Sequence, residues 1–457
     1  MPRRLLTILI FFLCNVVALA QARLPDERYK ADILLVVAHP DDDTLSSSYL
    51  ARAIFDLHKR VAVVYCTRGD SGSNSEGRER ARSLGLVREI EGRRAMAGLG
   101  ITNVWFLDGR DTSSQDVRLS LGTWPAGTVL EQMVRIFRLA RPEVVFTWMP
   151  SSVAGENHGD HQAAGVIATE AFDMAGDPAA FPAQLAAPMR QFENAFEGLS
   201  PWQAKKIYYF TDAFDDSFLH GHGPEYSGKE ISSSRKVSYL QLALHAAAPY
   251  YTQSPDPQLN RQIESGQNLD VILAKLQQYD YFPDPVRLLM GKSLVRSAAT
   301  GDVFEGIGPE AIPFQPPKRT PEPACSGICV SLAGPWGFYR EFWRAHDLQP
   351  LKFRRPEIAV EPNDTLTIPL LTENDSPSAT EITTGVVLPD GWKLREPLAP
   401  VSVPAGARAT ISIHAIAAIH ESEKFSEIKI TAQSGGRELL RESLFVEVSP
   451  YVAVQLK

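Results

Sequence analysis

The sequence lacks the patterns that mark several common classes of protein. It contains no G-x-G-x-x-G turn, so the glycine-rich signature of a dinucleotide-binding fold is missing. The net charge at pH 7 is −8 and no basic stripe stands out, which argues against a nucleic-acid-binding protein. The apolar run near the N-terminus, residues 5–13, is too short and too poorly flanked for a membrane span. We therefore expect no nucleic-acid partner and no integral membrane span in the mature protein.

Cysteine is also scarce, with four in 457 residues. Cys66 ends the apolar run 61–65 and is expected to be a buried small hydrophobic residue. Cys325 and Cys329 flank Ser-Gly-Ile, a spacing compatible with a local disulfide in an exported protein or with a two-cysteine metal site. No further Cys or His lies nearby at zinc-ribbon spacing. The sequence leaves the choice between the two open.

Residues 1–20 have the plan of a secretory signal peptide. Arg3 and Arg4 precede the apolar run, and Ala18-Leu19-Ala20 supplies a small-residue cleavage site. We therefore expect export to the periplasm or the extracellular space. The remaining chain is too long for one ordinary core and predicts two or three domains.

The most informative stretch begins with six apolar residues, 33–38, followed by His39-Pro40-Asp41-Asp42-Asp43. The apolar run predicts a strand buried on both faces, as in the middle of a parallel sheet. Three carboxylates would repel a pyrophosphate, whereas His and Asp together form a ligand set that zinc accepts. The alternative is a helix N-terminus, where one Asp is common as a cap. Three Asp residues beside a His are not explained that way.

Alternating strand and helix patterns follow as far as residue 147, with strands expected at 61–66, 104–107 and 144–147 and helices at about 78–99 and 129–139. They predict an α/β fold with a doubly wound, mostly parallel, Rossmann-like sheet and helices on both faces. In the strand order 3-2-1-4, the first and fourth strands are neighbours. The loop after the fourth strand, residues 151–161, is then expected to face His39. It ends in His158-Gly159-Asp160-His161, a second group of metal-ligating residue types.

These residues resemble the PIG-L/LmbE-like zinc N-deacetylases. The family has an Ala-His-Pro-Asp-Asp-Glu turn, with Asp43 here in place of Glu, and a His-Pro-Asp-His motif, with Gly159 here in place of Pro. The match extends to Arg88 and its helix and to the Arg110-Asp111 pair, and covers about residues 31–215.

The resemblance implies a role for each matching residue. His39, Asp42 and His161 bind one zinc ion, Asp41 is the general base, and a protonated His158 stabilises the oxyanion. Asp160 tunes the second histidine cluster, and Arg88 and Asp111 contact the sugar. Two histidines and a carboxylate leave a zinc position open for water, as a catalytic site requires.

We therefore expect a metal-dependent amide hydrolase that removes an acyl group, in particular acetyl, from the nitrogen of an amino-sugar-containing substrate. Two alternatives stay open: a metallophosphoesterase, which would need two metal ions, and a carbohydrate-binding protein with a vestigial metal site. The sequence determines neither the substrate nor the oligomeric state.

The chain divides into a catalytic domain at 28–310, with its motif-bearing core at 31–215 and a helical extension to about 310, then a Pro-rich linker at 311–350. Short strands separated by turns predict an antiparallel, immunoglobulin-like β-sandwich at 351–457. His220 and His222 lie in a tract that is either a lid or merely solvated.

Overall fold

The computed structural model describes residues 26–153, 158–188, 197–213, 217–267, 269–276, 282–321, 324–349, 351, 355–422 and 425–449. The predicted signal peptide and residues 154–157 of the loop after the fourth strand lie outside these ranges. Within them, no helix combines the length and the apolar character needed to cross a membrane.

A six-stranded sheet with the order β3-β2-β1-β4-β5-β8 forms the centre of the larger unit. The first five strands in this order are parallel, and β8 runs antiparallel to β5. Their bounds are β1 Ile33–Val37, β2 Val61–Tyr65, β3 Asn103–Phe106, β4 Val144–Trp148, β5 Lys206–Phe210 and β8 Leu289–Ser293. Every residue of β1 is fully buried, as its apolar run predicts. The predicted order 3-2-1-4 is confirmed, and β1 pairs with both β2 and β4.

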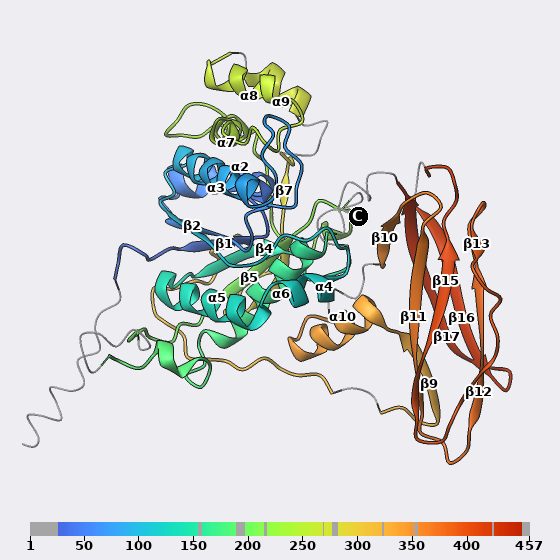
Figure 1. Cartoon of the computed structure of the whole chain (residues 1–457). Coiled ribbons are helices and arrows are strands. Elements are labelled where there is room, and N and C mark those ends of the chain that lie inside the picture. Colours follow the sequence, from blue (N-terminus) through green and yellow to red (C-terminus); the bar gives the residue numbers. More distant parts are fainter. Residues whose placement is uncertain are drawn as a thin grey trace, which may run out of the picture.

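Helices cover both faces of this sheet (Figure 1). On one side lie α2 Ser47–Phe55, α3 Ala81–Gly98 and α7 Tyr239–Ala247; on the other lie α5 Ala126–Ala140 and α6 Gly159–Met174. Two further helices, α8 Pro257–Glu264 and α9 Leu269–Leu276, pack beyond α7. The doubly wound, mostly parallel α/β fold is thus confirmed. Short elements complete the unit: η1 Asp42–Leu45, η2 Pro182–Gln184, η3 Ser217–Leu219, β6 Glu225–Tyr226 and β7 Val286–Arg287.

One helix lies where the sequence predicts only a loop. The turn-forming residues at 109–127 enclose α4, Val117–Thr123. The Asp116 carboxylate caps this helix by accepting from the Arg118 backbone N–H at 2.9 Å. The Gly and Pro residues around α4 indicate turns and conceal this short helix.

Two sheets form the predicted C-terminal β-sandwich, with the orders β10-β17-β16-β12-β14 and β13-β15-β11-β9. Within each of these two sheets the neighbouring strands are antiparallel, except that β10 runs parallel to β17. The bounds are β9 Ile328–Leu332, β10 Glu357–Val360, β11 Thr365–Asn374, β12 Thr380–Val387, β13 Lys393–Leu394, β14 Val401–Val403, β15 Arg408–Ile416, β16 Ser426–Ser434 and β17 Arg437–Val448. The inward residues form a separate apolar core. The immunoglobulin-like topology stays a prediction.

The range 311–350 is not a simple linker. It contains β9, which pairs with β11, and α10 Gly334–Ala345. The Pro-rich start of this range hid the alternation of Ile328, Val330 and Leu332, which are all buried in the sandwich. Cys325 and Cys329 form a disulfide at the start of β9, while Cys66 is fully buried as expected.

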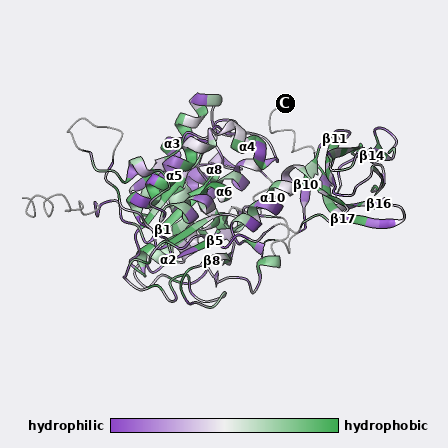
Figure 2. Ribbon diagram, turned by 90° about the horizontal axis from the view of Figure 1, so that it is seen from below, coloured by the Kyte–Doolittle hydropathy of each residue, from purple (hydrophilic) through white to green (hydrophobic). Residues whose placement is uncertain are grey.

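The sandwich lies beside the larger unit, and α10 lies between them (Figures 1 and 2). Figure 2 shows the apolar strand β1 inside the larger unit. The Tyr339 hydroxyl of α10 donates to Gln162 Oε1 at 2.7 Å. The Gln115 side chain also pairs with both backbone groups of Ala359, at 2.7 and 3.0 Å. These bonds join the sandwich to the carboxyl edge of the sheet.

Candidate metal centre

The loops that follow β1 and β4 meet at the carboxyl edge of the sheet, as expected if these two strands are neighbours. His39 Nδ1 lies 3.0 Å from His161 Nε2. Asp42 Oδ1 lies 3.6 Å from His39 Nδ1 and 3.4 Å from His161 Nε2. One ligand atom from each of His39, Asp42 and His161 can therefore face a common point, and all three residues are buried.

The turn that carries the aspartates is tightly held and locally strained. Asp41 has φ 134°, which is uncommon for a residue with a side chain. Its carbonyl oxygen accepts from the backbone N–H of Thr44 at 2.9 Å and from the Thr44 hydroxyl at 2.7 Å. The strained turn separates the Asp41 and Asp42 side chains, so these consecutive carboxylates have different partners.

The two oxygens of Asp42 have different environments. Oδ2 accepts three hydrogen bonds: from Ala38 N at 2.9 Å, from His39 N at 3.0 Å and from Trp148 Nε1 at 2.7 Å. Oδ1 faces the two histidines. Burial opposes ionisation, but His161 and His39 hold the pKa of Asp42 well below its ordinary value. Asp42 is thus an ionised carboxylate that presents one oxygen to the centre.

His39 is oriented by carboxylates on its far side. Its Nε2 lies 3.1 Å from Asp111 Oδ1 and 3.6 Å from Asp160 Oδ2. Burial alone would lower the pKa of His39, but Asp111, Asp160 and Asp42 raise it above the ordinary value. A hydrogen on Nε2 pointing at these carboxylates leaves Nδ1 as the nitrogen that can bind a metal, a common arrangement for metal-binding histidines.

His161 lies in the first turn of α6, with its ring stacked on the indole of Trp148. The ring centroids are 4.2 Å apart and the planes differ by 12°. Burial opposes protonation, but the neighbouring Asp42 carboxylate raises the pKa of His161.

Asp41 lies beside the centre and pairs with Arg88. Arg88 Nη2 donates to Asp41 Oδ1 at 2.9 Å and to Pro40 O at 3.0 Å. Burial raises the pKa of Asp41 to about 7, although the charge of Arg88 opposes the shift. A carboxyl group with a pKa near neutrality can take up and release a proton, so the geometry suits the predicted general base.

His158 caps the start of α6, and its environment does not favour the predicted protonated form. Its Nδ1 accepts from the backbone N–H of Asp160 at 3.1 Å. Burial, with His39 and His161 nearby, lowers the pKa of His158 well below the ordinary value. The expected protonated form is therefore disfavoured: burial and the hydrogen bond accepted by Nδ1 favour a neutral imidazole with its hydrogen on Nε2, where it can still donate.

Asp160 bonds chiefly to the loop that carries Asp111. Its oxygens accept from Thr112 N at 2.8 Å and from Thr112 Oγ1 at 2.7 Å. Asp160 Oδ2 also lies 3.6 Å from His39 Nε2. The carboxylate thus links the two loops and faces the first histidine; a tuning function toward the second cluster stays a prediction.

Arg88 and Asp111 are both engaged with protein groups. Arg88 is 4% exposed and also donates to Gly69 O at 2.9 Å. Asp111 Oδ2 accepts from Ser71 N at 2.8 Å, while Oδ1 faces His39. The predicted sugar contacts of Arg88 and Asp111 stay predictions, because neither contact is tested by these bonds.

Sequence reasoning missed Trp148 and the partners of Asp43. The Asp43 carboxylate is buried and accepts from the hydroxyls of Tyr65, at 2.8 Å, and Tyr250. Tyr250 belongs to the segment after α7, far away in the sequence. For Trp148 the sequence offers one signal: a Trp directly follows the predicted fourth strand, 144–147. The observed strand β4 includes this residue.

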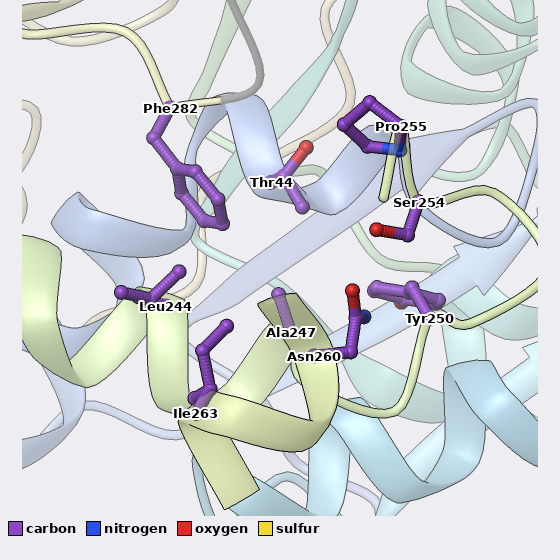
Figure 3. Close-up of a pocket in the computed structure, with 9 residues that line it drawn as sticks. All are labelled: Thr44, Leu244, Ala247, Tyr250, Ser254, Pro255, Asn260, Ile263 and Phe282. Carbon is purple, nitrogen blue, oxygen red and sulfur yellow. The ribbon is translucent and has the colours of Figure 1, made fainter. Parts of the chain in front are cut away.

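A small pocket lies behind η1, on the side of α7 and α8 (Figure 3). The Tyr250 ring forms part of its wall, and none of the described residues that line it is charged. Its lining residues are Thr44, Leu244, Ala247, Tyr250, Ser254, Pro255, Asn260, Ile263 and Phe282.

A comparison with protein families matches residues 34–172 to the model described as PIG-L, GlcNAc-PI de-N-acetylase. Residues 34–172 form a PIG-L domain. The PIG-L domain contains all three residues of the candidate centre, together with Asp41 and His158.

Curated relatives of this domain are named 1D-myo-inositol 2-acetamido-2-deoxy-alpha-D-glucopyranoside deacetylase. One, from Thermobispora bispora, is 28% identical over 192 residues, covering 39% of this chain and 58% of that protein. Another, from Streptomyces avermitilis, is 30% identical over 201 residues, covering 41% of this chain and 62% of that protein. The chain therefore spans about three fifths of the length of these relatives.

Among solved structures, N,N'-diacetylchitobiose deacetylase from Pyrococcus horikoshii has a TM-score of 0.37 and 18% identity, over 64% of this chain and 92% of that one. A conserved protein from Thermus thermophilus has a TM-score of 0.36 and 21% identity, over 58% of this chain and 97% of that one. TM-scores this low say nothing about the activity of the PIG-L domain.

Proposed function

We propose that this protein is an exported, zinc-dependent hydrolase that removes an N-acetyl group from an amino-sugar-containing substrate. The observation that carries this proposal is the convergence of His39, Asp42 and His161 on one point with Asp41 beside it. The names of the relatives of the PIG-L domain, which specify an acetamido-sugar deacetylase, support the reaction and the class of substrate.

The donor set suits a single zinc ion. Two imidazole nitrogens and one carboxylate oxygen are a set that occurs at catalytic zinc sites, which use three protein ligands. When bound, zinc acts as a Lewis acid and lowers the pKa of a water molecule toward about 7. The carboxylates behind His39 and the N–H groups on Asp42 Oδ2 hold both ligands in the required form.

Asp41 is the proton carrier in the proposed reaction. With a pKa near neutrality, it accepts a proton from the attacking water and then delivers it to the nitrogen of the leaving amine. Arg88 donates to one oxygen of Asp41 and so restrains the position of this carboxylate.

His158 stabilises the carbonyl oxygen of the substrate in this account. Because its Nδ1 accepts a backbone N–H, its Nε2–H is the group that can donate to the developing oxyanion. Its neutral form is sufficient for that hydrogen bond.

The test combines metal analysis with acetate release from N-acetylglucosamine conjugates. We expect about one zinc per chain, and the Asp41→Asn variant should keep the zinc and lose about 100-fold or more of the activity. The matched control is Asp32→Asn, at the opposite end of β1, where the carboxylate accepts from Arg60 N; its activity should equal that of the wild type.

Other outcomes of the same experiment would contradict the proposal. Two metal ions with phosphatase activity would indicate a metallophosphoesterase. Sugar binding without zinc or acetate release would indicate a carbohydrate-binding protein with a vestigial site.

Export is proposed from residues 1–20, and a disulfide such as Cys325–Cys329 is typical of oxidising compartments. Mass spectrometry of the protein purified from periplasm or medium should give a mature N-terminus close to residue 21. Retention of residues 1–20 on the purified protein would contradict it.

A further inference from the structure

Trp148 contacts two of the three candidate metal ligands at once. Its indole Nε1–H donates to Asp42 Oδ2 at 2.7 Å, and its ring stacks on His161 with centroids 4.2 Å apart. It is the last residue of β4, the strand that pairs with β1. The side chain therefore lies between the two loops that form the centre.

The hydrogen bond from Trp148 determines which oxygen of Asp42 is available. Ala38 N and His39 N approach Oδ2 from the backbone of the same turn, and the indole N–H adds a bond from a different strand. With three donors on Oδ2, only Oδ1 is directed at His39 Nδ1 and His161 Nε2. A partial rotation of the carboxylate about χ2 would break all three bonds.

The stacking contact restricts His161 in a complementary way. The planes of the two rings differ by 12°, so the indole lies flat against the imidazole and limits its rotation about χ2. The indole is itself 1% exposed, and the Phe210 ring of β5 packs against it at 4.8 Å. A side chain at position 165 would place its Cβ 2.3 Å from the Trp148 carbonyl oxygen, so α6 packs closely on this part of β4.

We propose that Trp148 is a positioning residue for the metal, which fixes Asp42 as a one-oxygen ligand and holds the His161 ring in the orientation for binding. This inference rests on the proposed function only in placing the metal at His39, Asp42 and His161. If the inference is right, the affinity for the metal depends on the Trp148 indole N–H, although this group bonds to Asp42 and not to the metal.

The test is the zinc dissociation constant of the Trp148→Phe variant, measured by competition with a chromophoric chelator. Phenylalanine keeps an aromatic ring beside His161 but removes the N–H on Asp42 Oδ2. We expect zinc binding to weaken about 10- to 100-fold, the usual effect of losing a partner that orients a metal ligand.

Trp202→Phe is the matched control. The Trp202 indole also donates one hydrogen bond, to Pro142 O at 2.7 Å, at the opposite edge of the sheet. The same chemical change there should alter the zinc dissociation constant by less than about twofold. Equal zinc affinity in the two variants, with both folded by circular dichroism, would overturn the inference.

A measurement on the wild type covers the case in which Trp148→Phe does not fold. In protein labelled with ¹⁵N-indole tryptophan, one indole N–H resonance should shift on zinc titration, because among the described residues only Trp148 donates its indole N–H to a candidate ligand. Zinc binding with no shift of any indole resonance would overturn the inference. A wild type that binds no zinc would overturn the proposed function itself.

Discussion

At the scale of the residue, two of the three candidate ligands, Asp42 and His39, are fixed by groups that bond to their far sides. Asp42 Oδ2 and His39 Nε2 are both occupied by protein partners, which leaves Asp42 Oδ1 and His39 Nδ1 toward the centre. Asp111 belongs to this supporting set, because one of its oxygens faces His39 and the other accepts from Ser71 N. The geometry therefore ties Asp111 to the tautomer of a metal ligand.

This leads to a prediction for Asp111→Asn. The amide oxygen would pair with the Ser71 N–H, so the amide NH₂ would face His39 Nε2 and favour the tautomer with hydrogen on Nδ1. Zinc affinity should then fall about 10- to 100-fold in a chelator competition. Asp108→Asn, three residues earlier in the same loop, is the control.

The result also tests the sugar contact that the family resemblance implies for Asp111. If Asp111 served only to bind the sugar, KM would rise while the zinc affinity stayed at the wild-type value. A loss of zinc affinity would instead place its main effect on His39.

The meeting of the two loops at one sheet edge could be predicted from the sequence, and the family resemblance names His39, Asp42 and His161 as the candidate ligands. The charge states and the supporting contacts could not be predicted. The neutral state of His158 depends on burial and on two neighbouring histidines, which only the folded structure brings together. Trp148 looks in sequence like any apolar strand residue, since its N–H partner, Asp42, lies in the turn that follows a different strand.

At the scale of the element, apolar runs predicted the first four strands of the sheet. Residues 33–38 and 144–147 predicted β1 and β4 and their adjacency, because buried parallel strands have continuous apolar sequences. Glycine- and proline-rich segments were a poor guide, since α4 and β9 lie inside them. In these two segments the Gly and Pro residues indicate turns but do not indicate the short helix or strand between the turns.

Asp56 joins two elements of the helical layer. It follows α2, and its carboxylate accepts from the Ser233 N–H at 2.8 Å, the Ser234 N–H at 3.1 Å and the Tyr239 hydroxyl at 2.6 Å. Hydrogen bonds from Ser234 and Tyr239 lower the pKa of Asp56 well below its ordinary value of 3.8. These hydrogen bonds to Asp56 hold the start of α7 against the end of α2.

This predicts a pH-dependent effect of Asp56→Asn. A carboxyl group whose pKa is lower in the folded state stabilises the fold above its unfolded pKa of about 3.9, and this contribution is lost as the pH falls toward the folded value. The urea midpoint of the variant should lie below that of the wild type at pH 7. The difference should stay constant down to about pH 5 and narrow below about pH 4. A difference that is the same at pH 7 and pH 3.5 would contradict this account.

At the scale of the whole molecule, the C-terminal sandwich is bonded to the part of the PIG-L domain that carries the centre. The Tyr339 hydroxyl donates to Gln162, the residue after His161, and Gln162 Nε2 donates to Gln115 O at 3.1 Å. The Gln115 side chain pairs with Ala359 of β10. The sandwich and α10 thus support the loop that ends at α4 and the first turn of α6.

We expect Tyr339→Phe to lower the free energy of unfolding by about 1–2 kcal/mol, because it removes a fully buried hydrogen bond between two units. Tyr251→Phe is the matched control, since the Tyr251 hydroxyl donates to Glu264 at an exposed position; its effect should be within about 0.5 kcal/mol. Urea unfolding of both variants measures the difference. Equal stability of the two would mean that the contact between the units contributes nothing.

The central claim, that two loops far apart in the sequence hold one metal ion, can be observed directly by anomalous diffraction at the zinc edge from crystals grown with zinc. We predict a single peak bound by His39 Nδ1, Asp42 Oδ1 and His161 Nε2, each at about 2.0–2.2 Å. Absence of a peak at these atoms, or a zinc ion held by other residues, would contradict the account.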